Sequence, residues 1–164
     1  MFTLKLPTPQ LVSHRIESHA MGGNIFISTD KSLLNIDLIH NFLRNSYWAR
    51  DIPLETVKKS INHSLCFGVY EGKCQVGFAR AITDFACFAY IADVFIIPEK
   101  QGKGLGKRLM KFIMDSPELA GLRRWHLVTL DAQKFYKQFG FRTPENSEHH
   151  MEIKNLNIYK TKGS

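Results

Sequence analysis

The chain has 164 residues, 44% of them apolar and 23% charged, which is ordinary for one soluble globular domain, 1–164, with a sizeable core. No apolar run is long enough to cross a bilayer, and the N-terminal MFTLKLPTPQ lacks the long apolar core of a secretory signal, which argues against a membrane protein and a secreted one. The 22 basic and 15 acidic side chains give a net charge of +7, which suits an anionic partner.

The first part of the chain predicts one strand and two helices. Residues 1–20 are mixed and partly extended, and residues 24–28 (NIFIS) form a short strand. Residues 37–45 (DLIHNFLRN) carry apolar side chains at helical spacing. After the interruption at SYW, Pro53 begins a second helix, because proline is tolerated in a first turn. The apolar face of that helix consists of Leu54, Val57 and Ile61.

The rest of the chain alternates between strands and helices. Residues 65–70 and 75–83 predict two strands joined by a Glu-Gly-Lys turn, and 88–97 is almost wholly apolar, as in a buried strand. A glycine-rich loop then precedes a helix through Met110 and Met114. The remaining predicted elements are a strand at 125–130, a short helix at 132–139 that stops at Gly140, and a last strand at 150–153.

This order predicts an α+β fold, a mixed α/β domain. The strands in the middle of the chain are joined by short turns and must be antiparallel. The later strand–helix–strand unit should be parallel with a right-handed crossover. We therefore expect a mixed sheet with helices on both faces.

The stretch PEKQGKGLGKRLM, residues 98–110, combines freely bending glycines with positive charge between a strand and a helix. The dense basic cluster here favours a compact phosphorylated ligand over a long polyanion such as nucleic acid, although a solvated basic helix face remains an alternative. A Walker A loop does not fit, because Arg108 follows Gly106-Lys107 and Gln101 stands where the first glycine belongs. A Rossmann fingerprint fails at its third glycine, where the chain has Lys107. The cluster consists of Lys100, Lys103, Lys107, Arg108 and Lys111.

The spacing Gln101-x-x-Gly104-x-Gly106 resembles the pyrophosphate loop of the GNAT (GCN5-related N-acetyltransferase) superfamily. The preceding ADVFIIPEKQ is similar to the signature strand of that family, and AQKFYKQFGF, residues 132–141, is similar to its late helix and turn. The resemblance covers most of the chain and is most specific over 91–141. It implies a mostly antiparallel sheet that splays at the cofactor site, and acetyl-CoA as the co-substrate, with no metal.

The resemblance also implies which residues contact coenzyme A. Glycines let main-chain N–H groups converge on the diphosphate, and the N-terminus of the following helix adds its dipole. The pantetheine arm would pair with the strand around 95–97, with the N–H of Val94 or Phe95 as an oxyanion donor. Asp131 stands where many members carry asparagine, and helix N-capping is the preferred interpretation. The cofactor-binding set is Val94, Phe95, Ile96, Ile97, Gln101, Gly102, Lys103, Gly104, Leu105, Gly106, Lys107 and Asp131.

The resemblance also implies two catalytic residues. Tyr136 matches the tyrosine that acts as a general acid towards the leaving thiolate, a role that suits a phenol; packing between helix and sheet is the alternative. Asp93, on the signature strand, is either the general base, an acceptor-binding group or a structural carboxylate. Weaker candidates for the base are Tyr90, Asp84, His126 and a chain of water molecules.

The acceptor site is expected in the loop between the first two helices, where Tyr47, Trp48 and Arg50 lie. Aromatic side chains suggest a lined pocket, although Trp48 could equally anchor the loop on the core. Arg50 favours an amine that carries a carboxylate.

The three cysteines contain no CxxC pair, which argues against a disulfide framework or zinc site and makes the cytoplasm the expected location. They have no partnered histidine, so direct transfer of acetyl to a primary amine of a small molecule is the expected chemistry. A protein or peptide amine, and a non-catalytic acyl-CoA-binding or nucleic-acid-binding domain, are the alternatives. A homodimer is a weaker implication of the family.

Overall fold

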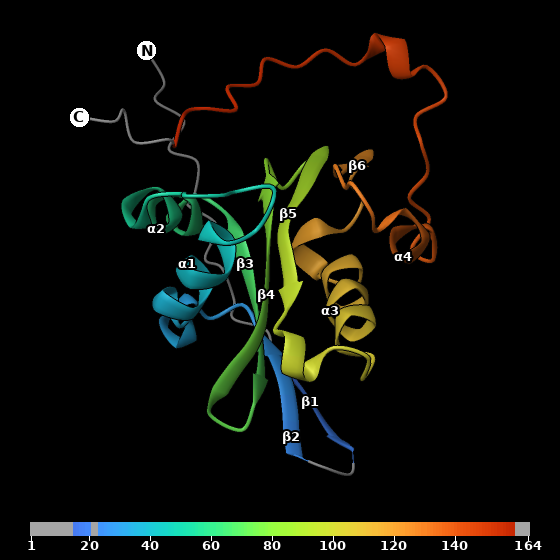
Figure 1. The fold of residues 1–164 in the computed structure, drawn as a ribbon. Coiled ribbons are helices and arrows are strands. Elements are labelled where there is room, and N and C mark those ends of the chain that lie inside the picture. The colour runs from blue at the N-terminus through green and yellow to red at the C-terminus, as the bar shows by residue number, and fades with distance from the viewer. Residues whose placement is uncertain (1–14, 21–22, 160–164) are drawn as a thin grey trace, which may run out of the picture.

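The computed structural model describes residues 15–20 and 23–159, with side chains from residue 24 onward. Its strands form one six-stranded sheet in sequential order, in which each neighbouring pair is antiparallel except the last pair, which is parallel (Figure 1). This confirms the predicted mixed, mostly antiparallel sheet. The strands are β1 (Arg15–Ala20), β2 (Gly23–Ser28), β3 (Leu65–Glu71), β4 (Cys74–Thr83), β5 (Phe88–Ile96) and β6 (Arg124–His126).

Helices cover both faces of the sheet, as predicted (Figure 1). On one face lie α1 (Ile36–Arg44) and α2 (Leu54–Asn62), whose buried residues pack with Phe78 and Phe95 of the sheet. The Asn35 side chain caps α1 by accepting from the Leu38 N–H, and Pro53 precedes α2. On the other face, α3 (Leu105–Met114) and the short α4 (Gln133–Lys137) pack on a second core around Phe67.

The structure differs from the sequence-based predictions at both ends of the chain. Residues 15–20 form the regular strand β1, whereas only partial extension was predicted; residues 1–14 of that prediction lie outside the described residues. The predicted strand at 125–130 is reduced to 124–126, because β6 then diverges from β5. The predicted last strand at 150–153 is wrong: these residues form no strand.

Residues 142–159 instead form what we call the strap, a segment whose only regular element is a single 3-10 turn at Ser147–His149. Figure 1 shows the strap leaving the α4 side of the molecule, crossing beyond the upper ends of the central strands and reaching the α2 side. None of the helices among the described residues is long and apolar enough to span a membrane.

A β-bulge in β5 fixes the middle of the sheet. The register passes from Phe78↔Phe95 to Arg80↔Ala92, so two residues of β5, Asp93 and Val94, lie opposite Ala79 alone. Asp93 has a φ of 55°, a left-handed conformation that non-glycine residues adopt at a cost. The strict alternation assumed from the sequence is therefore broken at this residue.

The bulge is held by a network around the Asp93 carboxylate. Arg80 Nε donates to Asp93 Oδ2, and the side chains of this ion pair are only 17% and 9% exposed. Arg80 Nη1 also donates to Ser64 Oγ at 3.2 Å, and Trp48 Nε1 donates to Asp93 Oδ1 at 3.2 Å. The network thus ties β4, β5 and the loop after α1 together.

Asp93→Asn should lower the free energy of unfolding by roughly 2–3 kcal/mol, because it leaves the mostly buried Arg80 guanidinium without a countercharge. Urea denaturation would measure the loss. Asp115→Asn breaks the exposed Lys111–Asp115 pair and serves as the matched control, with an expected change within about 0.5 kcal/mol. Equal, small changes in both variants would contradict a stabilising role for the Asp93 network.

Candidate active site

The loop between β5 and α3 has the geometry of an open anion cradle. Gly102 and Gly104 have φ values of 74° and 76°, and a Cβ added at either position would meet no atom within 4 Å. Gly104 is the N-cap residue of α3, and no side chain caps the helix there. The N–H groups of the first turn of α3 therefore lack helical partners and point towards the loop, where an anion can accept from them.

Only part of the predicted basic cluster faces this cradle. Lys100 pairs with Glu71 of β3, Lys111 pairs with Asp115, and Arg108 Nη2 donates to the Ile25 carbonyl of β2 at 3.4 Å. Lys103 and Lys107 are exposed, and neither has an ion pair among the described residues. These two lysines are the side chains that remain for a phosphate.

The loop is fastened to β5, and its last glycine faces α4. Gln101 Nε2 donates to the Ile96 carbonyl at 2.8 Å, which fastens the loop to the end of β5. A Cβ on Gly106 would lie 3.5 Å from the Phe135 ring of α4, an ordinary van der Waals distance, so this position faces α4 without requiring glycine. The predicted loop residues therefore differ: Gly102 and Gly104 open the cradle, whereas Gln101 fastens it to β5.

β5 and β6 diverge next to the loop. They pair only over Phe88–Tyr90 and Arg124–His126, so no described strand lies beside the edge of β5 from Ile91 to Ile96 on that side. Among the residues predicted to contact the pantetheine arm, Ile97 donates its N–H to the Val76 carbonyl of β4 at 2.9 Å, so this N–H is not free to bond to a ligand. Val94, Phe95 and Ile96 lie along the open edge, with the Phe95 ring stacked on Phe42 of α1 at 3.8 Å between centroids.

Tyr136 of α4 lies on the other side of this opening. Its ring packs edge-on against Phe135 and Phe141, and it is half-buried. Burial, together with the nearby Tyr47 and Asp131, raises the pKa of Tyr136 to about 12. The phenol therefore keeps its proton throughout the neutral range.

Tyr47 joins the loop after α1 to the segment after β6. Its hydroxyl accepts from the Leu130 N–H at 3.1 Å, and its ring packs edge-on against Trp48. Tyr47 also contributes to the raised pKa of Tyr136, so the two phenols are near each other. Contacts thus connect Tyr47, Trp48 and Asp93, and Tyr136 lies near Tyr47; their catalytic and acceptor roles stay predictions.

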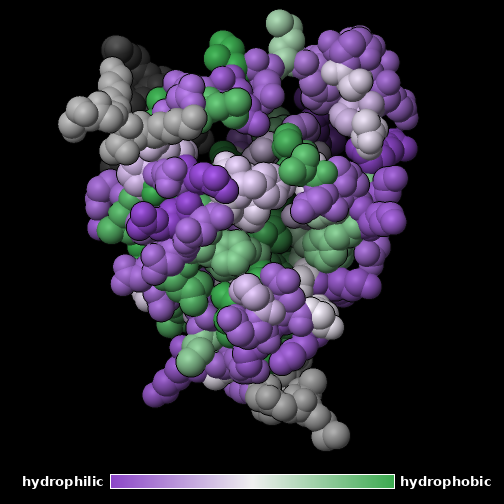
Figure 2. Space-filling model, in the orientation of Figure 1, coloured by the Kyte–Doolittle hydropathy of each residue, from purple (hydrophilic) through white to green (hydrophobic). Residues whose placement is uncertain are grey.

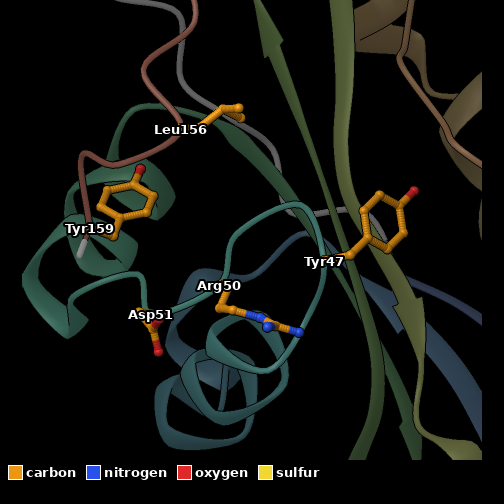
Figure 3. Close-up of a pocket in the computed structure, with 5 residues that line it drawn as sticks. All are labelled: Tyr47, Arg50, Asp51, Leu156 and Tyr159. Carbon is orange, nitrogen blue, oxygen red and sulfur yellow. The ribbon is translucent and has the colours of Figure 1, made fainter.

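Two cavities flank Tyr47. One has a volume of about 280 Å³ and is lined by Tyr47, Arg50 and Asp51 of the loop and by Leu156 and Tyr159 of the strap (Figure 3). The other has a volume of about 470 Å³ and lies between the end of α1 and Pro98, with Phe42 and Trp48 in its wall. Figure 2 shows apolar side chains exposed in the middle of the viewed face. Arg50 lines the smaller cavity, and its role in binding an acceptor stays a prediction.

Arg80 and the strap residues were not identified from the sequence. An arginine between apolar residues in QVGFARAIT was the available signal for a buried ion pair. No comparable signal exists for Leu156 and Tyr159, because their position depends on the path of the whole strap.

The prediction that Asp131 caps the helix after it is wrong. The N-cap residue of α4 is Ala132, without a side-chain cap, and the Ala132 N–H is bonded to Thr129 Oγ1 at 3.1 Å. Asp131 is exposed and does not cap the helix, because α4 begins one residue later than a cap at Asp131 requires.

The weaker candidates for a base lie at the far end of β5. Asp84 accepts from the N–H groups of Ala86, Cys87 and Phe88 in the β4–β5 turn, and these bonds, with one from the Cys87 thiol, lower the pKa of its carboxyl. His126 stacks between Tyr90 and His150, and burial, His150 and Arg124 lower its pKa. Within the described ranges, no cluster of three or more His, Cys, Asp or Glu side chains could hold a metal ion.

Comparison with known proteins agrees with this geometry. The family model of the acetyltransferase (GNAT) domain matches residues 62–143. A Gibberella zeae protein assigned as an acetyltransferase is 32% identical over 73% of this chain and 80% of its own, and an uncharacterised N-acetyltransferase of Gracilaria tenuistipitata is 34% identical over 73% and 68%.

The fold has a counterpart among solved structures. The crystal structure of a Xanthomonas campestris protein assigned to the GNAT family superposes with a TM-score of 0.82, at 47% identity, over 84% of this chain and 97% of that one. The glycine cradle, the divergence of β5 from β6 and the extent of these matches lead to one conclusion: the chain belongs to the GNAT family of acetyltransferases, enzymes that use acetyl-CoA as acetyl donor.

Proposed function

We propose that this acetyltransferase transfers acetyl from acetyl-CoA directly to the primary amine of a small molecule. The observation that carries the proposal is the Tyr47 bridge. The hydroxyl of Tyr47 is fixed to the Leu130 N–H, Tyr47 is one of the residues that line the 280 Å³ cavity, and it is near enough to Tyr136 to raise the pKa of that phenol. A small amine in that cavity would be next to the proposed acid, whereas an extended peptide needs a long groove.

Acetyl-CoA, as co-substrate, supplies the activated acyl group. Its diphosphate fits the cradle of Gly102 and Gly104, where free N–H groups and a helix dipole favour negative charge. Lys103 and Lys107 add countercharge, and Leu105 and Gly106 contribute the first turn of α3. The open edge of β5 at Val94, Phe95 and Ile96 offers backbone groups to the pantetheine arm, and an N–H there would polarise the thioester carbonyl.

Tyr136 is the proposed general acid. Because its pKa is raised to about 12, the phenol is always protonated at neutral pH and can donate to a departing thiolate. The raised pKa also makes it a weaker acid than a free phenol, so its contribution depends on being held close to the sulfur.

Asp93 is proposed to act by holding Trp48 rather than by taking a proton. Both of its oxygens already accept hydrogen bonds, from Arg80 and Trp48, so neither is well placed to receive a proton from the amine. The amine would lose its proton to water in the exposed cavity.

The acceptor is proposed to carry a carboxylate near its amine. Arg50 is exposed in the cavity wall, has no ion pair among the described residues, and can bind a carboxylate with two parallel hydrogen bonds. Tyr47, Leu156 and Tyr159 give the same cavity an apolar lining for the remainder of a small molecule.

Gly104→Glu should abolish acetyl-CoA binding, because it places a carboxylate where the diphosphate would accept from the helix. Calorimetric titration with acetyl-CoA, CoA and dephospho-CoA would measure this, with an expected loss of at least about 100-fold for two like charges in contact. Gly72→Glu is a matched control: Gly72 also has a positive φ, 58°, and open space around it, but lies in the β3–β4 turn. Wild-type protein that binds none of the three ligands would overturn the proposed function.

Tyr136→Phe should lower kcat by about 10²–10³-fold and leave acetyl-CoA affinity unchanged, because it removes only the donated proton. Steady-state kinetics and calorimetry would separate the two effects. In wild type, ionisation of this group should not reduce activity below about pH 10, since its pKa is raised to about 12. Tyr70→Phe is the control, because the buried hydroxyl of Tyr70, on β3, has no hydrogen-bond partner in the described part of the chain. An unchanged kcat in Tyr136→Phe would remove the phenol from the chemistry.

Arg50→Ala should raise KM for amines that carry a carboxylate by about 10-fold or more and leave KM for their amide analogues unchanged. Thiol release measured across matched acid and amide pairs would show the split. Arg44→Ala removes an exposed arginine at the end of α1 and should leave both classes unaffected. Equal KM values for acids and amides in wild type would contradict a carboxylate site at Arg50.

A further inference from the structure

The larger of the two cavities beside Tyr47 is apolar, and the proposed acceptor does not use it. Its volume is about 470 Å³, which is ordinary for a small-molecule site. None of the described residues in its wall is charged, whereas the wall of the smaller cavity contains Arg50 and Asp51. The apolar part of the larger wall consists of Phe42, Tyr47, Trp48 and Pro98.

The polar side chains in this wall already have partners within the protein. Ser46 Oγ donates to a carbonyl of α1 at 2.7 Å and accepts an N–H at 3.2 Å. Asn45 Nδ2 donates to the Asn41 carbonyl at 2.7 Å, and Trp48 Nε1 donates to Asp93. A ligand in this cavity therefore gains affinity mainly by burying apolar surface against the aromatic rings.

Two of the rings in the wall contact β5 where the thioester is proposed to lie. The Phe42 ring stacks on Phe95, with 3.8 Å between centroids, and Trp48 is bonded to Asp93 in the bulge. Val94 lies between these two residues of β5, and the N–H of Val94 or Phe95 is the proposed partner of the thioester carbonyl. The apolar cavity is thus next to the place from which the carbon chain of an acyl group would extend.

We propose, resting on the proposed position of the thioester, that this cavity holds an acyl chain longer than acetyl, so that propionyl-CoA and butyryl-CoA are ligands of the same cofactor site. Acetyl places a single methyl group beyond the carbonyl carbon, and a cavity of about 470 Å³ leaves room for further carbons. Tyr47 lines both cavities, and it would separate the acyl chain from an amine held beside Arg50.

The transfer step is the same for each chain length. The amine nitrogen forms a bond to the thioester carbonyl carbon as the carbon–sulfur bond breaks. The sulfur takes a proton from Tyr136, and the phenolate regains one from the water that accepted the proton of the amine. The products are an N-acyl amine and free CoA, so a longer chain changes how the donor is bound and not how it reacts.

Calorimetric titration of the full chain with CoA, acetyl-CoA, propionyl-CoA and butyryl-CoA tests the subsite without an acceptor. Burying one CH₂ group lowers Kd about 4-fold, so butyryl-CoA should bind about 15-fold more tightly than acetyl-CoA. If acetyl-CoA binds but the gain for butyryl-CoA is below about 4-fold, the value of one CH₂ group, the subsite is refuted and the proposed function stands. A chain that binds none of the four ligands would refute both.

Filling the cavity locates the chain. Asn41 is exposed on α1 and contributes to the wall, so Asn41→Trp should bring the Kd values of butyryl-CoA and acetyl-CoA within about 4-fold of each other. The Kd of acetyl-CoA itself should change by less than about 4-fold. Asn62→Trp makes the same change at the exposed last residue of α2 and should keep the wild-type preference. A preference that survives in Asn41→Trp would show that the chain lies elsewhere and would overturn the subsite.

Trp48 reports on the cavity without any change in its wall. The chain has two tryptophans, so Trp125→Phe, on β6, leaves Trp48 as the only one. Trp48 is 43% exposed, and a chain that displaces water from its indole should shift the emission maximum to shorter wavelengths with butyryl-CoA relative to acetyl-CoA. Equal emission maxima with the two ligands at saturation would place the acyl chain away from Trp48 and overturn the subsite.

Discussion

The ion pair between Arg80 and Asp93 is the interaction on which the arrangement of the site depends. Asp93 adopts a left-handed conformation in the bulge of β5, and this costs free energy that the neighbours of the carboxylate must offset. Arg80 supplies the countercharge from β4, and Trp48 adds a hydrogen bond from the loop after α1. One carboxylate thus sets the shape of the strand beside the proposed cofactor site and the position of the loop over the proposed acceptor site.

The second constraint is that β5 pairs with β6 over only three residues. The divergence leaves the edge of β5 open on the side where α3 presents the uncapped N-terminus of Gly104. Tyr47 spans this region by accepting from the Leu130 N–H, so the loop after α1 is attached both to β5, through Trp48 and Asp93, and to the segment after β6. Hydrogen bonds from three parts of the chain, the loop after α1, β5 and the segment after β6, surround the opening between β5 and β6. The width of this opening therefore depends on the fold rather than on any one side chain.

Local chemistry made part of this structure predictable from the sequence. The helical spacing in DLIHNFLRN, the apolar run 88–97 and the glycine loop at Gly102 and Gly104 all depend on neighbours in the chain, and each element is present. Lys100 and Arg108 show where local reasoning ends. Both were assigned to the phosphate cluster, but Lys100 pairs with Glu71 and Arg108 bonds to Ile25, partners that only the folded sheet brings near. The bulge at Asp93 and the early end of β6 escaped prediction for the same reason, since both depend on cross-strand register.

The strap is a different case, because its predicted strand is wrong although the apolar residues have the right spacing. Residues 150–153 alternate as a strand should, yet they form no strand. When a predicted strand is absent because a turn takes its place, its apolar residues are usually buried in some other way. Met151 and Ile153 are instead fully exposed, and the neighbouring Glu148 pairs with His149. A strand needs a neighbouring strand as well as a pattern of its own, and none of the described strands pairs with these residues.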